Sequence, residues 1–530
     1  MTEQIILQFL EEQAEVIKKL YKDETYSYWE ATTTGNKEAY ERYEISQKEF
    51  AKFFNNSENF KKIKEFLSLD IKDELVKRQL RRLYNAYLGK QGDLNLINKI
   101  VEQSTAIEEK FNTFRAKING KEFTDNQIKD ILRQENDSKR LQEAWEASKM
   151  QGELVAKELI ELIKLRNQLA KSLGFRNYYL LYLETHEQTE EELIKIFSRL
   201  EEYTDKVFRE LKKEVDRLLS KRYKTDDLKP WHYHDLFFQE GPRIYNVDLD
   251  KIYNEGILEK SEKFYSSIGL DVSDILERSD LYEKPGKYQH AYCIDMDRDG
   301  DIRTLMNIKE DSYWMATILH ELGHAVYDKY IDKNLSFLIR DKSHILTTEA
   351  IALLMERNTK NTSFIRRFCK VNEEELSKIE EEVKKSLKLR QLVFSRWSQV
   401  MFNFERRLYD NPDQDLNKLW WDLVKKYQLI DFSRDKADWA SKIHFVSSPI
   451  YYHNYTLGEL FASQINNYIA KNILKEDASL KNLDYSGKEQ IGEYLKSRIF
   501  FPGARYKWNE LIEKSTDEEL NPEYWVDDFC

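Results

Sequence analysis

The amino-acid sequence predicts a mainly α-helical protein, and three observations lead to this prediction. Only 16 glycines and 7 prolines punctuate the 530 residues. Charged residues make up 34% of the chain, in long runs rich in Glu, Lys, Leu and Ala, which are good helix formers. Apolar side chains recur at helical spacing from the start, as Ile5, Phe9, Leu10 and Ala14 do. At this length we expect two domains or one domain of two lobes, and we favour a single domain over 1–530.

Composition also restricts the partners that the chain can have. A net charge of −11 argues against nucleic acid, because binding to phosphates requires a basic surface. The three cysteines are odd in number and far apart, at Cys293, Cys369 and Cys530, which indicates free thiols in a reducing compartment. The N-terminus lacks the features of a signal peptide, and no apolar run of about 18 residues occurs. We therefore expect a cytoplasmic monomer that binds no membrane.

The first part of the chain, 1–130, is predicted to form a group of lid-like helices. Helical periodicity leads to a stop at Thr34-Gly35. Further helices are predicted over 39–54, 60–68, 73–88 and 93–117. No residue in this part stands at the spacing of a metal or catalytic site, so we interpret it as scaffold or lid. Beyond it, a long helix of mixed charge is predicted over 190–221.

The most informative motif lies in the stretch 312–356 and reads His320-Glu321-Leu322-Gly323-His324. Two histidines four residues apart stand on the same helix face, about 6 Å apart along the axis. Such a pair can bind one zinc ion, and the intervening Glu can take a proton from water. The alternative is a chance match on a packed helix. Apolar residues flank the motif, however, and two buried imidazoles without a ligand would need other partners.

Glu349 is the candidate third ligand. It follows His324 by 25 residues, which is long enough for a helix, a turn and a returning helix, so we predict a zinc helix pair at about 311–358. Three protein ligands with one open position are typical of a catalytic zinc site. The alternative is that Glu349 is an ordinary exposed helix residue.

A small β-ribbon is predicted just before the metal motif. The best strand candidates are 288–293 and 302–308, and the acidic stretch 295–301 lies between them. This stretch superficially suggests a calcium loop, but the Glu at the twelfth position is missing, so we interpret it as a hairpin turn. A strand edge beside a metal can bind an extended peptide through backbone hydrogen bonds.

Two aromatic clusters contain further candidates. His232 and His234 are spaced two apart after Pro230; they can ligate a metal, but an irregular aromatic segment with satisfied imidazoles is the favoured interpretation. The second cluster runs from Lys442 to Tyr455 within a segment of about 440–465. Hydrolysis of an amide creates an oxyanion that needs hydrogen-bond donors, and His and Tyr supply them. The alternative is that this aromatic loop simply packs.

These residues together resemble those of the angiotensin-converting enzyme family of zinc peptidases and, more distantly, of the thimet oligopeptidase and oligoendopeptidase F family. The similarity extends from the Phe9-Leu10-Glu11-Glu12 and Tyr28-Trp29 regions to Pro502-Gly503-Ala504 and Trp508. The resemblance implies a two-lobed helical fold with a deep central channel. It also implies one Zn²⁺ per chain, bound by His320, His324 and Glu349, and Glu321 as the catalytic base.

The resemblance assigns further roles residue by residue. A His thirty residues before the first zinc ligand corresponds to His290, and it is followed by Ala291, whose backbone would meet the substrate. The free carboxylate of a peptide would be bound by Gln239, Lys442 and Tyr452. The scissile carbonyl or its neighbours would be contacted by His290, His444 and Tyr455. A carboxylate clamp of this kind implies release of C-terminal dipeptides.

The sequence departs from the angiotensin-converting enzyme pattern at three places. Leu353 replaces an Asp one turn after the third ligand, whereas Glu356 follows the thimet oligopeptidase pattern. Asn454 replaces an Arg that is tied to chloride activation, so chloride dependence is not expected. The segment from His444 to Tyr455 is one residue longer than in that family, which leaves the roles of Tyr451, Tyr452 and Tyr455 open.

Three functions remain consistent with the sequence. The first is a peptidyl-dipeptidase that acts on unstructured peptides. The second is an oligoendopeptidase of the related family, which would tolerate a blocked C-terminus. The third is a non-catalytic peptide-binding protein with the same fold, which the presence of Glu321 disfavours.

Overall fold

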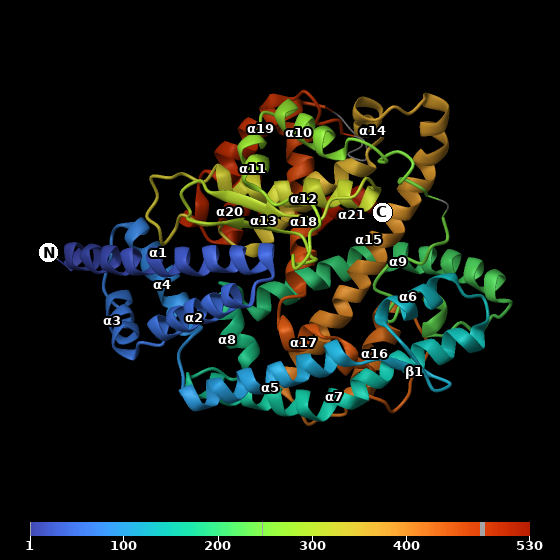
Figure 1. The fold of residues 1–530 in the computed structure, drawn as a ribbon, viewed down its shortest axis with the longest axis horizontal. Coiled ribbons are helices and arrows are strands. Elements are labelled where there is room, and N and C mark those ends of the chain that lie inside the picture. The colour runs from blue at the N-terminus through green and yellow to red at the C-terminus, as the bar shows by residue number, and fades with distance from the viewer. Residues whose placement is uncertain (1, 246, 477–482) are drawn as a thin grey trace.

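A computed structural model describes residues 2–245, 247–476 and 483–530, and it confirms the prediction of a mainly helical protein (Figure 1). The helices up to residue 223 are α1 (Thr2–Thr34), α2 (Lys37–Phe54), α3 (Ser57–Leu67), α4 (Glu74–Leu88), α5 (Leu94–Thr113), α6 (Asp125–Gln134), α7 (Ser138–Ser172), α8 (Tyr178–Thr185) and α9 (Glu190–Tyr223). The later helices are α10 (Ile257–Ser267), α11 (Ser273–Arg278), α12 (Ser312–Lys329), α13 (Ile345–Arg357), α14 (Thr362–Phe368), α15 (Glu373–Asp410), α16 (Leu416–Gln428), α17 (His444–Ser447), α18 (His453–Tyr468), α19 (Glu489–Leu495), α20 (Trp508–Thr516) and α21 (Glu523–Phe529).

Capping side chains explain why several helices begin where the sequence indicates. Asp73 accepts hydrogen bonds from the backbone N–H groups of the first turn of α4, and Asp93 does so for α5. Thr189 caps α9 in the same way, and three glutamates follow it in the first turn. These groups satisfy N–H donors that have no partner within the helix, and the acidic residues favour its positive end.

The predicted helix over 93–117 is wrong at its C-terminal end. The helix α5 ends at Thr113, and a short antiparallel ribbon follows, formed by β1 (Ala116–Ile118) and β2 (Lys121–Phe123). Between the strands, Asn119 and Gly120 both have positive φ, at 50° and 79°. An Asn-Gly pair favours a tight hairpin turn of this kind, so the local turn chemistry overrides the helical periodicity here.

The second ribbon lies beside the metal motif, as predicted, but its first strand starts later than expected and its second strand ends at Leu305 instead of at 308. The strands are β3 (Tyr292–Asp295) and β4 (Ile302–Leu305), paired antiparallel with Tyr292 opposite Leu305. Residues 288–291, which we expected in the strand, are not part of it. The acidic stretch forms the turn between the two strands, as predicted. Seven residues after β4, the chain enters α12.

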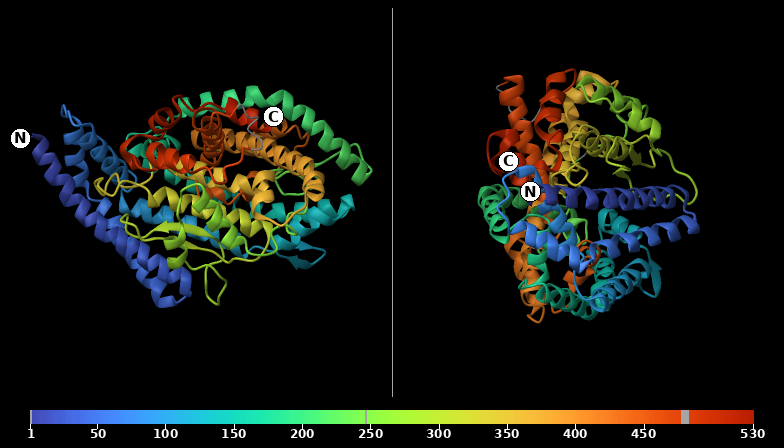
Figure 2. Two further views of the ribbon diagram at one scale, coloured as in Figure 1. Left: turned by 90° about the horizontal axis from the view of Figure 1, so that it is seen from above. Right: turned by 90° about the vertical axis from the view of Figure 1, so that its left-hand side faces the viewer.

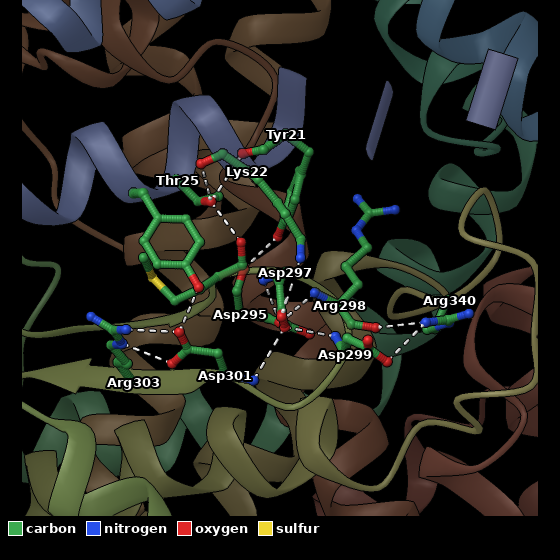
Figure 3. A network of polar contacts seen from close by, with 12 residues as sticks. Tyr21, Lys22, Thr25, Asp295, Asp297, Arg298, Asp299, Asp301, Arg303 and Arg340 are labelled. Atoms are coloured by element: carbon green, nitrogen blue, oxygen red, sulfur yellow. Dashed lines mark hydrogen bonds and ion pairs between the residues drawn. The ribbon is translucent and has the colours of Figure 1, made fainter. Parts of the chain in front are cut away.

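The turn of this ribbon is bonded to the first helix of the chain (Figure 3). The Tyr21 hydroxyl donates to the carbonyl of Asp295 at 2.7 Å, and Thr25 Oγ1 donates to the carbonyl of Met296 at 2.7 Å. Lys22 Nζ lies 3.5 Å from Asp297. The α1 helix is thus attached directly to the ribbon that precedes the metal motif.

In the parts of the chain that the structure describes, the helices surround two apolar cores. The smaller core unites side chains of α1 to α4, including Phe9, Leu80 and Tyr87, with a few residues of later segments such as Phe337. These N-terminal helices lie together on one side of the molecule (Figures 1 and 2). The larger core includes α5 and continues through α7, α12, α13, α15 and α18. Among the described residues, no helix is long and apolar enough to span a lipid bilayer.

Candidate metal centre

The two histidines of the motif converge with Glu349 at the interface of α12 and α13. The Nε2 atoms of His320 and His324 lie 3.2 Å apart, and His320 Nε2 lies 3.8 Å from a carboxylate oxygen of Glu349. Ligand atoms of all three residues lie within 4.8 Å of one another. Two nitrogens bound to one tetrahedral zinc at ordinary bond lengths are separated by about 3.3 Å. The donor set therefore fits a zinc ion.

Glycines allow the helices that carry these donors to approach one another. A Cβ atom at Gly323 would lie only 2.7 Å from Ala352 Cα, so α12 packs directly on the backbone of α13. A Cβ at Gly458 would lie 3.1 Å from Glu349 Cβ, which brings α18 close to the third ligand. Close packing of this kind fixes the relative positions of the ligands before a metal binds.

The outer ring nitrogen of each histidine has its own partner. His320 Nδ1 lies 3.2 Å from Glu356, and His324 Nδ1 lies 2.7 Å from Thr348 Oγ1. Burial alone would lower the pKa of His320, but Glu356 and the other carboxylates raise it to about 9. The hydrogen bond to His320 and the charge of Arg390 hold the pKa of Glu356 at about 2, against the effect of burial. Such partners orient a ligating imidazole so that Nε2 faces the metal.

The contact between Thr348 and His324 predicts an effect on metal affinity. Replacing Thr348 with Val removes the partner of Nδ1, so the Kd for Zn²⁺ should rise roughly tenfold or more. Competition titration with a chromophoric chelator measures this change. Thr347→Val is the matched control, because Thr347 Oγ1 instead bonds the His344 carbonyl and Tyr327. Equal affinities in the two variants would contradict the orienting role of Thr348.

Glu321 lies beside the ligands but is not one of them. Its side chain is buried, with 8% of the residue exposed. Burial raises the pKa of Glu321 to about 7, partly offset by His320 and by the backbone N–H of Cys293, which donates to the carboxylate. A carboxyl group whose pKa lies near neutrality can both accept and return a proton. The strand β3 thus contributes directly to the environment of this carboxyl group.

The three residues predicted to bind a peptide carboxylate, called the clamp here, are Gln239, Lys442 and Tyr452. Lys442 Nζ donates to Gln239 Oε1 at 2.7 Å. Lys442 is buried over the rings of Trp397 and Tyr452, and burial lowers its pKa to about 8. Asp235 accepts hydrogen bonds from the backbone N–H groups of Phe237, Gln239 and Glu240, which fixes the loop that carries Gln239. The structure therefore brings Gln239, Lys442 and Tyr452 together.

The segment that carries Tyr451, Tyr452 and Tyr455, called the tyrosine turn here, shows which hydroxyl reaches the metal ligands. The Tyr451 hydroxyl lies 3.4 Å from Glu349 Oε1, whereas the Tyr452 hydroxyl accepts a hydrogen bond from Trp397 at 2.7 Å. The Tyr455 ring packs against both, at centroid distances of 5.1 and 5.5 Å. The sequence offered three tyrosines for two roles, and the prediction assigned these roles to Tyr452 and Tyr455. Its contact with Glu349 adds it to the site.

The remaining candidates lie around this group. The His444 ring lies edge-on to Tyr452 at a centroid distance of 5.1 Å, and burial lowers the pKa of His444 to about 4. Its Nδ1 has no hydrogen-bond partner within the described part of the chain. His290 is exposed and contacts the ring of Tyr288, just before Ala291 and β3. The two histidines near Pro230 have protein partners instead of a metal group: Ser138 for His232 and Arg222 for His234.

Comparison with known proteins agrees with this geometry. The sequence profile described as "Peptidase family M3" matches residues 131–529, about three-quarters of the chain. The chain belongs to peptidase family M3. The matched region carries the three metal donors, Glu321, the clamp and the tyrosine turn. A second profile, described as angiotensin-converting enzyme, matches residues 1–231 of this M3 peptidase, so both halves of the predicted resemblance are confirmed.

Three curated proteins are similar to most or part of this chain. Angiotensin-converting enzyme-like protein Ace3 of Mus musculus is 21% identical over 97% of this chain and 73% of its own length. Carboxypeptidase 1 of Bacillus subtilis (strain 168) is 23% identical over 45% of this chain, and the match spans 51% of that protein. Thermostable carboxypeptidase 1 of Pyrococcus furiosus is 25% identical over 24% of this chain and 26% of its own length.

Proposed function

We propose that this M3 peptidase is a zinc metallopeptidase that hydrolyses short unstructured peptides and releases C-terminal dipeptides. The observation that carries the proposal is the pairing of Lys442 with Gln239, next to the turn whose Tyr451 reaches Glu349. A cation and an amide bind a peptide carboxylate well. If the C-terminus of the substrate peptide is held at a fixed position, that position determines which of its peptide bonds lies at the metal donors.

The residues divide the chemistry among them. A zinc ion held by His320, His324 and Glu349 would supply Lewis acidity for the hydrolysis. Glu321 would take a proton from the attacking water and return it to the leaving amine. The hydroxyls of Tyr451 and Tyr455, with His444, would donate hydrogen bonds to the oxyanion, and removing one such donor typically costs roughly 3 to 4 kcal/mol in the barrier.

The alternative function is an oligoendopeptidase of the thimet oligopeptidase and oligoendopeptidase F type. The contact between Glu356 and His320 favours it, because Glu356 follows the pattern of that family. Two relatives are named carboxypeptidase, so a third possible activity is the release of a single C-terminal residue. In each case the chain would bind peptides, and we expect no nucleic-acid or membrane partner.

One peptide in two forms distinguishes these functions. The zinc-loaded protein is incubated with a decapeptide that has a free C-terminus and with its C-amidated form, with and without a chelator, and the products are identified by mass spectrometry. We expect successive loss of dipeptides from the free form, at least tenfold slower cleavage of the amidated form, and no cleavage after chelation. Equal internal cleavage of both forms would instead support an oligoendopeptidase, and release of single residues a carboxypeptidase.

The clamp predicts a selective effect of Lys442→Met. This change keeps the length of the side chain but removes the ammonium group that would face the carboxylate, so KM for the free peptide should rise roughly tenfold or more. KM for the amidated peptide should change little, which makes that peptide the control. Equal losses for both peptides would show that Lys442 supports the fold and does not bind the carboxylate.

A further inference from the structure

The turn that carries Tyr451 contains a strained residue. Ile450 has φ of 58°, in the left-handed region that a β-branched residue rarely adopts. Its side chain is fully buried. A conformation of this kind persists only where the surroundings impose it, and it determines the direction in which the next side chain, Tyr451, leaves the backbone.

Glu405 of α15 is the group that fixes this residue. The buried Ile450 N–H donates to Glu405 Oε1 at 2.8 Å, and Glu405 itself is only 4% exposed. A buried backbone N–H without a partner is costly. The hydrogen bond therefore stabilises the one backbone conformation of Ile450 that presents its N–H to α15.

Arg166 of α7 holds the other end of the same segment. Its guanidinium donates to the carbonyl of Phe445 at 2.7 Å and to that of Val446 at 2.8 Å, and it contacts the Tyr409 hydroxyl at 3.2 Å. Tyr409 lies one turn after Glu405 on α15. The segment from α17 to Ile450 is thus held at two points, at the carbonyls of Phe445 and Val446 and at the Ile450 N–H, by buried side chains of neighbouring helices.

We propose that Glu405 is a positioning residue for the metal centre: by holding Ile450 in its left-handed conformation, it directs the Tyr451 hydroxyl toward Glu349. This inference rests on the proposed function only for its effect on catalysis. The placement of Tyr451 is a structural claim that can be tested without activity. Glu405 does not touch the metal donors, so it acts through the turn.

Three variants test the proposal through kcat and KM of the zinc-loaded protein. Glu405→Gln keeps an acceptor for the Ile450 N–H and should retain kcat within about threefold. Glu405→Leu removes the acceptor and should lower kcat at least tenfold with KM within about threefold, because Gln239 and Lys442 lie outside the turn. Glu405→Leu combined with Ile450→Gly should recover most of kcat, since Gly adopts positive φ without strain. This double variant also provides a second readout if Glu405→Leu alone folds poorly.

The matched control is Asn403→Leu. Asn403 lies two residues before Glu405 on α15 and is also buried, but it donates to the carbonyl of Gln399 and to the Tyr427 hydroxyl. Asn403→Leu should lower the stability of the protein without changing kcat.

In the Tyr451→Phe variant, adding Glu405→Leu should lower kcat little further, because the hydroxyl that Glu405 positions is already absent.

A crystal structure of Glu405→Leu separates this proposal from the proposed function. We expect the Tyr451 hydroxyl to move away from Glu349 and Ile450 to leave the left-handed region. If the parent protein hydrolyses no peptide, the proposed function fails, yet this structural result still decides the role of Glu405. An unmoved Tyr451, a loss confined to KM, or losses in Glu405→Leu and Tyr451→Phe that add independently would overturn the inference.

Discussion

Glu321→Gln is expected to lower kcat roughly 10³-fold while zinc content and peptide affinity stay close to those of the parent protein. The carboxyl group of Glu321 lies beside the metal donors without being one of them, and burial raises its pKa to about 7. Gln occupies nearly the same volume but can neither accept nor deliver the proton, and a positioned general base contributes about 10² to 10⁴ in rate.

Three measurements belong to this prediction: single-turnover hydrolysis, metal content after gel filtration, and peptide binding followed by calorimetry. Glu374→Gln serves as the control, since that residue lies on the exposed first turn of α15. Turnover of Glu321→Gln within tenfold of the parent rate would remove Glu321 from the role of base. Loss of zinc in the same variant would indicate that Glu321 supports the site instead.

Glu405→Gln is expected to raise the free energy of unfolding by about 3 kcal/mol at pH 7. Burial raises the pKa of Glu405 to about 8 from an ordinary value of 4.5, although the Ile450 N–H and Arg166 act in the opposite direction. The folded parent therefore holds a proton that the unfolded chain releases. Its stability falls as pH rises from about 4.5 to about 8, and then levels off.

The size of this effect follows from the interval between the ordinary pKa of 4.5 and pH 7, because each pH unit in that interval corresponds to about 1.4 kcal/mol. Gln has no proton to lose, so the stability difference between variant and parent should be small at pH 5 and should grow up to pH 8. Urea titrations of both proteins at several pH values measure it. A difference that does not change with pH would show that Glu405 does not titrate in this window.

The sequence allowed the metal donors to be predicted because their geometry is local. The spacing of His320 and His324 is fixed by one helix, and Glu349 follows on the next. The start of α9 was also predictable, since Thr189 and the acidic first turn are adjacent in sequence. Helical periodicity failed where a two-residue turn decides the structure, as at Asn119-Gly120.

Contacts between distant segments could not be predicted in this way. Thr348 is next to Glu349 in sequence, but its bond to His324 depends on how α12 packs on α13. The choice of Tyr451 over Tyr452 depends on the left-handed backbone of Ile450, for which the sequence offers no glycine as a signal. Glu405 lies 45 residues before Ile450, and no motif in the adjacent sequence indicates that it bonds this turn.

The attachment of α1 to the β3–β4 turn has a consequence for Glu321. Tyr21 and Thr25 donate hydrogen bonds to the turn of the β3–β4 ribbon. The Cys293 N–H, which donates to Glu321, belongs to the same ribbon. Through these contacts, α1 helps to fix the backbone N–H that favours the ionised form of the Glu321 carboxyl group.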